Sequence, residues 1–117
     1  MRAFPLALIL FLGACGGSAE KTDLANAGKA RSLLAEASLN LELAPRTAAT
    51  WTEQTRREAG AQLAALAAEA RSAGGADSAT IAQVATLPDH PDVALLQART
   101  AEARTIEARI EARLEGR

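Results

Sequence analysis

The stretch that decides the fold is residues 50–73, TWTEQTRREAGAQLAALAAEARSA. Alanine fills seven of the twelve positions from Ala59 to Ala70. Alanine has the highest helix propensity and loses almost no side-chain entropy on folding. Because such small side chains let helix axes approach closely, we expect a helix here that packs tightly on a neighbour. Its core-facing positions recur at steps of three and four: Thr52, Thr55, Ala59, Leu63, Leu66, Ala70 and Ala73.

Start and stop signals flank this helix. Thr50 and Glu53 fit a capping box, in which a hydroxyl and a carboxylate satisfy reciprocal backbone amides. Glu53 can also pair with Arg57 one turn further on. The pair Gly74-Gly75 predicts the end of the helix.

An earlier helix is predicted from Asp23, which can cap it, to Ala44, where Pro45 stops it. The short connection that contains Pro45 predicts an antiparallel hairpin of this helix and the helix of residues 50–73. The core-facing positions expected on the earlier helix are Leu24, Ala27, Arg31, Leu34, Ser38 and Leu41, with Leu33, Ala37 and Ala44 beside them.

Two further helices are predicted after the glycine pair. A short one over residues 77–87 is capped by Asp77 or Ser78, and a long one runs from Pro91 to about Glu115. The sequence therefore predicts an all-α fold, in which a small antiparallel hairpin carries a short third helix and a long C-terminal helix, as a three- to four-helix bundle. The inward-facing residues expected on the last two helices are Ile81, Val84, Leu87, Leu96, Ala103, Ile106, Ile110 and Leu114.

The last predicted helix carries two rows of charge. Glu107, Glu111 and Glu115 follow one flank of its apolar stripe, and Arg109 and Arg113 follow the other. The simpler interpretation is an amphipathic helix docked on its own hairpin. The alternative is a self-association or partner surface, on which a second helix neutralises both rows.

The N-terminal residues carry a targeting signal. Arg2 supplies a positive start, residues 4–12 are almost wholly apolar, and small residues lead into Cys15. This layout is typical of a secretory signal with a small-residue cleavage site. A helix over residues 3–12 would reach only about 15 Å, half of the hydrocarbon core, so we do not expect it to span a membrane.

Residues Leu12-Gly13-Ala14-Cys15 resemble the lipobox of bacterial lipoproteins, in which a Leu-rich segment ends in small residues and a cysteine. The resemblance implies cleavage between Ala14 and Cys15 and a lipid on the Cys15 thiol. Gly16 stands where lipoproteins retained in the inner membrane often carry aspartate, which implies the outer membrane, facing the periplasm. The alternative is a plain secretory signal with an incidental cysteine.

The resemblance divides the chain into three segments. Residues 1–14 are the signal peptide, residues 15–21 the lipidated cysteine with a flexible tether, and residues 22–117 the helical domain. The 103 residues after cleavage contain 27 alanines but only 17 leucines, isoleucines and valines, which predicts a thin, alanine-rich core. The formal net charge of −1 gives no reason to expect a nucleic-acid partner.

Few residues offer chemistry. His90, with Asp89 and Asp92, could present an imidazole and two carboxylates to a metal, but a helix-start turn with capping acids is the simpler interpretation. We therefore expect no metal and no cofactor. Trp51, the only tryptophan, is expected to anchor the core, with a ligand or partner contact as the alternative. No phosphate-binding glycine loop and no nucleophile with a nearby base is recognisable, so we expect no enzymatic activity.

These observations predict a non-enzymatic envelope lipoprotein, held to the membrane by an N-terminal lipid. Its helical domain is expected to act as a protein-interaction or structural module, with an envelope protein or a second copy of itself as partner. Two alternatives stay open: a self-associating structural or stress protein of the envelope, and a small-ligand binder.

Overall fold

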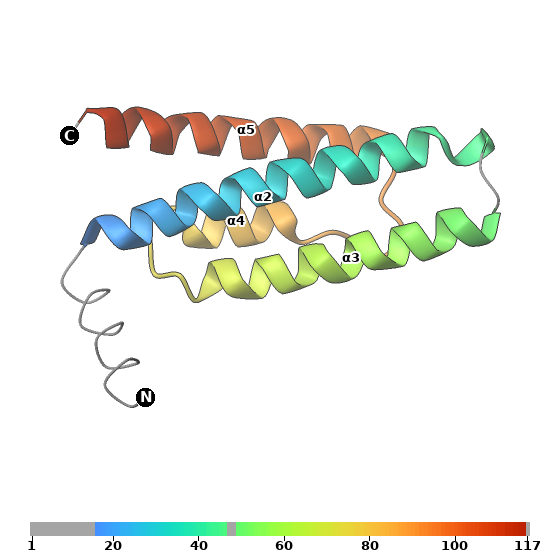
Figure 1. Ribbon diagram of the computed structural model, residues 1–117, viewed down its shortest axis with the longest axis horizontal. Coiled ribbons are helices and arrows are strands. Elements are labelled where there is room, and N and C mark those ends of the chain that lie inside the picture. The colour runs from blue at the N-terminus through green and yellow to red at the C-terminus, as the bar shows by residue number, and fades with distance from the viewer. Residues whose placement is uncertain (1–15, 47–48, 117) are drawn as a thin grey trace, which may run out of the picture.

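The computed structural model describes residues 16–46 and 49–116, and these residues form helices joined by short turns (Figure 1). The elements are α2 (Gly16–Glu42), the 3-10 turn η1 (Ala44–Arg46), α3 (Ala49–Arg71), α4 (Ser78–Ala85) and α5 (Val93–Glu115). No strand occurs in the described part of the chain. The predicted all-α fold is therefore confirmed. The predicted signal peptide and the lipidation and cleavage residues, Ala14 and Cys15, lie outside the described residues.

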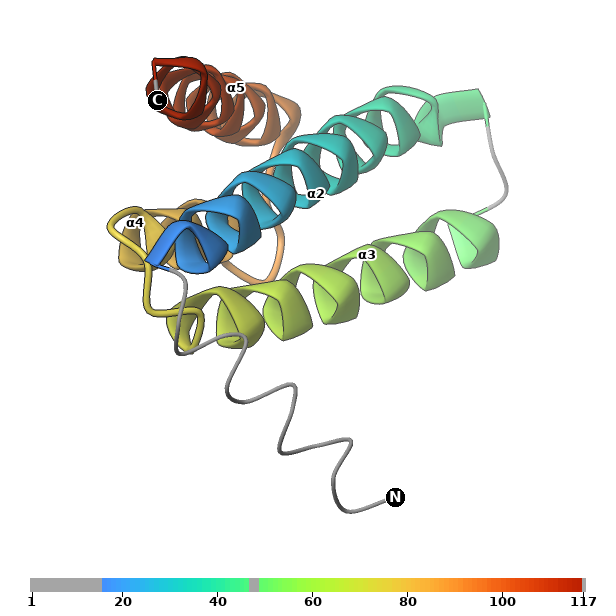
Figure 2. The same ribbon diagram turned by 60° about the vertical axis from the view of Figure 1, so that its left-hand side comes forward.

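Helix α2 is the element around which the others are arranged. It packs most extensively on α5 and also contacts α3 and α4, while α3 packs on α2 and α4. Figure 2 shows α2 between α5 and α3, with α4 beside the N-terminal part of α2. The antiparallel hairpin of α2 and α3 is confirmed, and the C-terminal helix lies on its α2 side.

The core is small and rich in alanine. Among the described residues, alanine accounts for seven of the fifteen buried apolar side chains. The thin, alanine-rich core that the sequence predicts is thus confirmed, and few large side chains contribute to it. The largest fully buried apolar side chains are Leu34, Leu63, Ile81, Leu96 and Ile110.

The N-terminal end of the bundle differs from the prediction. Helix α2 begins at Gly16, so residues 16–21, expected as a flexible tether, are helical. Asp23, expected to cap the start of this helix, lies inside it and is buried. The physical reason is tertiary: Glu20 pairs with Arg113 of α5, and Asp23 binds the start of α4.

The other helix ends are close to their predicted positions. Helix α3 begins at Ala49, which places Thr50 inside the helix instead of at its cap. The predicted pair of Glu53 and Arg57 is present at 3.3 Å. Asp77 stands before α4, but its side chain makes no capping bond, whereas Asp92 caps α5 by accepting from the Leu95 amide at 2.8 Å.

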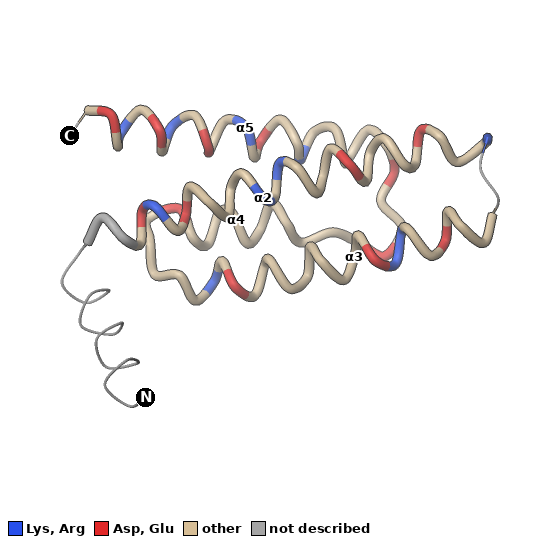
Figure 3. Tube along the Cα trace, viewed as in Figure 1, with Lys and Arg blue, Asp and Glu red and all other residues tan. Residues whose placement is uncertain are grey.

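Three of the five residues in the charge rows of α5 are paired within the chain, and Figure 3 shows where the charged positions lie along the helices. Glu107 accepts from Arg31 of α2 at 2.6 Å, and Arg109 donates to Asp77 at 2.7 Å. Arg113 pairs with both Asp77 and Glu20. The interpretation of α5 as a helix docked on its own hairpin is therefore confirmed. Within residues 16–46 and 49–116, no helix combines the length and the apolar character that a membrane crossing requires.

Candidate functional site

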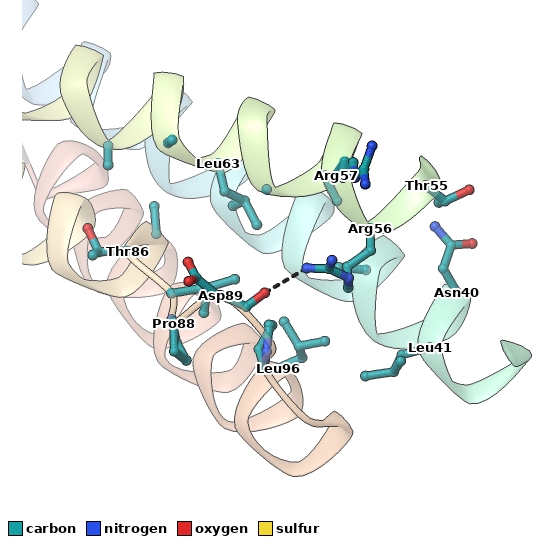
Figure 4. Close-up of a pocket in the computed structure, with 18 of the residues that line it drawn as sticks. Asn40, Leu41, Thr55, Arg56, Arg57, Leu63, Thr86, Pro88, Asp89 and Leu96 are labelled. Carbon is teal, nitrogen blue, oxygen red and sulfur yellow. Dashed lines mark hydrogen bonds between the residues drawn. The ribbon is translucent and has the colours of Figure 1, made fainter. Parts of the chain in front are cut away.

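The short length of α4 leaves a cavity in the bundle. Helix α4 has eight residues and α3 has 23, so at 1.5 Å per residue they extend about 12 Å and 35 Å. Beyond the end of α4, the space beside α3 is not filled by another helix. It forms a cavity of about 480 Å³, closed on one side by the connection that leads through Pro88 to α5 (Figure 4).

Five parts of the chain line this cavity. Helix α3 contributes one face between Thr52 and Arg71, and α2 contributes Ala37, Asn40 and Leu41. The remaining wall consists of the end of α4, the connection to α5, and Leu96. The predicted inward stripe of α3 thus has two surroundings, because its C-terminal half is buried in the core and its N-terminal half lines the cavity. The lining residues of that N-terminal half include Thr52, Thr55 and Ala59.

One arginine closes the cavity toward the connection. Arg56 Nη1 donates to the backbone oxygen of Asp89 at 2.7 Å, which links α3 to the connection before α5 (Figure 4). Arg56 also pairs with Glu53, to which Arg57 donates at 3.3 Å. The hydrogen bond from Arg56, with the charges of both arginines, outweighs the effect of burial and lowers the pKa of Glu53. The single carboxylate of Glu53 therefore pairs with both Arg56 and Arg57 at this end of the cavity.

At the other end of the cavity lies Arg71, whose guanidinium uses only part of its hydrogen-bonding capacity. Arg71 Nη2 donates to Thr86 Oγ1 at 3.4 Å, which is a long hydrogen bond. No carboxylate of the described residues forms an ion pair with Arg71. The ionisable side chains that line the cavity are Arg56, Arg57, Arg71 and Asp89. The cavity thus combines an apolar interior with an excess of positive charge at its edge.

A second polar cluster fastens the opposite end of α4. Asp23 is 1% exposed and accepts from the Asp77 amide at 3.0 Å and from Ser78 Oγ at 2.6 Å. Ser78 Oγ in turn accepts from the Gly75 amide at 2.8 Å. A buried carboxylate from α2 therefore caps α4, a role that the sequence assigned to Asp77 or Ser78.

The same cluster is continued by ion pairs. Asp77 accepts from Arg109 and Arg113, and Arg113 Nε donates to Glu20 at 2.9 Å. Burial alone would raise the pKa of Asp77, but the hydrogen bonds from Arg113 and Arg109 outweigh it, so its pKa lies below the ordinary value. These pairs join α2, α4 and α5. Their carboxylates are occupied by protein donors, so we interpret the cluster as structural.

The candidate residues named from the sequence lie at the surface. Trp51 is 63% exposed, so the prediction that it anchors the core is wrong. Trp51 lies in the first turn of α3, and no helix of residues 16–46 and 49–116 covers its side chain. His90 is exposed in the connection between α4 and α5, next to the cavity-lining Asp89 and Pro91. Within the described residues, no three His, Cys, Asp or Glu side chains are grouped so as to hold a metal ion.

Sequence reasoning missed Arg71, Thr86 and the buried Asp23. Arg71 and Thr86 are fifteen positions apart, and they come together because the turn between α3 and α4 brings α4 back alongside α3. Gly75 was the available signal for Asp23, since a side chain at that position would collide with the carboxylate. In the sequence, however, the same glycine is fully explained as a helix stop.

Comparison with known proteins adds no relative: no family model, no curated protein and no solved structure matches this chain. The candidate function therefore rests on the residues and their geometry.

Proposed function

We propose that this protein is a lipid-anchored, non-enzymatic lipoprotein of the bacterial cell envelope, whose helical bundle serves as an interaction module at the membrane surface. The observation that carries the proposal is Leu12-Gly13-Ala14-Cys15 at the end of an apolar run. The large apolar residue, the small residue before the cleavage point and the cysteine stand in the order of a lipobox. Cys15 is also the only cysteine of the chain, and lipidation gives it a role.

The start of the bundle supports close anchoring. Helix α2 begins at Gly16, the residue after Cys15. Its first turns are fixed to the rest of the bundle, because Glu20 pairs with Arg113 of α5. A lipid on Cys15 would thus hold this end of the bundle directly against the membrane, in our proposal the outer membrane on its periplasmic side.

The opposite end of the bundle supports an interaction role. The exposed large hydrophobic side chains of the described residues are Leu39 at 55%, Leu43 at 44% and Trp51 at 63%. All three flank the connection of α2 and α3, which lies at the other end of α2 from Gly16 (Figure 1). We call them the distal patch. Exposed tryptophan and leucine side chains near the end of the bundle away from the anchor are a favourable surface for a protein partner.

Self-association through α5 has less support than the sequence suggested. Of the charge rows that motivated it, Glu107, Arg109 and Arg113 pair within the same chain, with Arg31, Asp77 and Glu20. A non-enzymatic role is supported by the surroundings of His90, which is exposed and is not among the lining residues of the cavity.

The anchor is tested by metabolic labelling with radioactive palmitate, membrane fractionation and mass spectrometry of the mature N-terminus. Wild-type protein should incorporate label, sediment with membranes and begin with an acylated Cys15. Cys15→Ser should do none of these. A matched control, Cys15→Ser with Ser32→Cys, restores a thiol at an exposed position of α2 and should stay unlabelled. An unmodified Cys15, or a first residue other than Cys15, would overturn the proposal.

The interaction role is tested by placing a photoreactive amino acid at position 51 or, as control, at the exposed position 104 of α5. Irradiation of intact cells should give a discrete adduct from position 51 alone. Equal adduct patterns from both positions would show that the distal patch has no partner of its own.

A further inference from the structure

We propose that the cavity beside α3 binds a single-chain anionic amphiphile, with the alkyl chain against the apolar wall and a carboxylate or phosphate head on Arg71. This inference rests on the cavity and is independent of the lipid anchor on Cys15. Either proposal can therefore fail while the other stands.

The volume of the cavity favours a slender occupant. At about 480 Å³ it falls in the range of small-molecule sites, roughly 300 to 1,000 Å³. A further helix about 10 Å across and 20 Å long would displace about 1,600 Å³. The whole empty space, including the open mouth, is about 1,320 Å³. A helix of that size from a partner could not lie wholly inside the cavity, whereas an extended alkyl chain could.

The wall of the cavity suits an alkyl chain. We call the part of the cavity along α3 the channel; the middle of its α3 wall consists of apolar and mostly small residues, Ala59, Gly60, Leu63, Ala64 and Ala67. From Thr52 to Arg71 this face extends about 28 Å, and an acyl chain that fills one leaflet of a bilayer spans about 15 Å. The channel is thus long enough for such a chain. Leu41, Leu87, Pro88 and Leu96 cover its other sides.

The electrostatics of the edge favour an anionic head. Arg56 and Arg57 share the carboxylate of Glu53, and Arg56 is also held by the Asp89 backbone oxygen. Within residues 16–46 and 49–116, the hydrogen bond that the Arg71 side chain makes is the long one to Thr86. Its guanidinium keeps donors in the fork geometry that matches a carboxylate or a phosphate. Arg71 therefore binds the head, and the chain runs from it along α3.

The experiment uses the full chain reconstituted in phosphatidylcholine nanodiscs and a photoreactive hexadecanoate that carries a diazirine on its chain. After irradiation, the labelled peptides are identified by mass spectrometry. Adducts are expected in residues 52–71 and 85–96. Adducts concentrated on the distal patch, or spread evenly over α2 and α5, would overturn the proposal.

Competition separates the parts of the ligand. Unlabelled hexadecanoate and a lysophosphatidic acid with the same chain length are the two anionic competitors. If only hexadecanoate competes, the head group is a carboxylate, and if only lysophosphatidic acid competes, it is a phosphate. If both compete, the site selects for negative charge without distinguishing the two head groups. Each of these results supports the inference. Hexadecanol should compete at least tenfold less well. Equal competition by hexadecanol, or by inorganic phosphate, would overturn it.

Variants connect the labelling to the residues. Arg71→Gln should lower labelling about tenfold, whereas Arg104→Gln, which removes an exposed arginine of α5 outside the cavity, should leave it unchanged. Ala59→Leu should lower labelling by filling the channel, with an unchanged circular dichroism spectrum as the control for folding. Because each methylene moved out of water raises affinity about fourfold, hexadecanoate should also compete far better than decanoate. Equal labelling of the Arg71→Gln and Arg104→Gln proteins would refute the assignment of the head.

Discussion

Alanine substitutions at three glycines test the packing of the bundle, because the same added methyl group meets three different surroundings. At Gly75 an ideal Cβ would overlap Oδ2 of Asp23 and lie 2.6 Å from its Cγ, with the Ala19 carbonyl oxygen at 3.0 Å. The carboxylate has no room to retreat, because it is 1% exposed and held by the Asp77 amide and Ser78 Oγ. Gly75→Ala must therefore displace it or shift the turn before α4.

The size of the effect follows from these contacts. A hydrogen bond to a charged group contributes about 1.5 to 3 kcal/mol, and Asp23 accepts two. With partial relaxation, we expect Gly75→Ala to lower the free energy of unfolding by about 3 kcal/mol, and the melting temperature by more than about 10 °C. Gly60→Ala should instead stabilise by up to about 1 kcal/mol, since no atom lies within 4 Å of the new Cβ in a helix interior. Gly74→Ala should cost about 1 to 2 kcal/mol, because its φ is +77°.

The assay is urea unfolding of the full chain followed by far-UV circular dichroism, with each glycine variant made in the wild-type and Asp23→Ala backgrounds. Without the Asp23 carboxylate, the cost of Gly75→Ala should fall by at least half, while the effects of the other two substitutions should stay the same. The reasoning is refuted if Gly75→Ala is as stable as Gly60→Ala. It is also refuted if the cost of Gly75→Ala is equal in both backgrounds.

Three further predictions concern charge and burial. The pKa of Asp77 lies below its ordinary value of 3.8, so its charge stabilises the fold above about pH 4, and this contribution is lost as the pH falls. Asp77→Asn should therefore make the free energy of unfolding fall less steeply at acidic pH. An unchanged acidic part of the curve of stability against pH would contradict this assignment. Arg31→Gln breaks a partly exposed ion pair with Glu107 and should lower the free energy of unfolding only slightly, and this loss should shrink further at 1 M salt. Leu34→Ala, at a fully buried position, should cost about 2 to 5 kcal/mol, whereas Trp51→Ala should change stability by less than about 0.5 kcal/mol; a large loss for Trp51→Ala in thermal unfolding would place it in the core after all.

The helices could be predicted from the sequence because their signals are local. Gly74-Gly75 and Pro88 bracket the short helix, which was expected over residues 77–87 and is found at Ser78–Ala85. The periodicity of α5 identified its buried face, including Ile106 and Ile110. These signals act within one or two turns of the chain, so they hold whatever the rest of the fold does.

The errors arise where a residue is governed by a distant part of the chain. Asp23 looks like a helix cap, but it caps a different helix 54 residues further on. Trp51 looks like a core aromatic, yet the bundle provides nothing to cover it. Residues 16–21 look like a tether because glycine and serine are poor helix formers, but a contact of Glu20 with α5 favours the helix there. Propensity cannot report such contacts.

The candidate site was harder to predict than the fold, because a cavity depends on how far neighbouring helices extend beside one another. Thr52, Thr55 and Ala59 follow the same period as the buried Leu63 and Leu66, and nothing in the pattern distinguishes their surroundings. Only the number of residues in α4 separates them, because it determines how much of α3 has a neighbour. The sequence predicted this helix over residues 77–87, whereas α4 spans only Ser78–Ala85, and this difference of almost one helical turn is why the cavity could not be predicted.

The two ends of α4 account together for the most distinctive features of the molecule. At its N-terminal end, Asp23 and the pairs of Asp77 with Arg109 and Arg113 fix the helix to α2 and α5. This attachment does not depend on packing along the whole length of α3, so α4 can stop after eight residues without leaving the bundle. At its C-terminal end, the early stop exposes the apolar face of α3 and places Thr86 beside Arg71. The polar cluster and the packing of α4 on α3 therefore hold this short helix in the bundle together, while its early end leaves the cavity open.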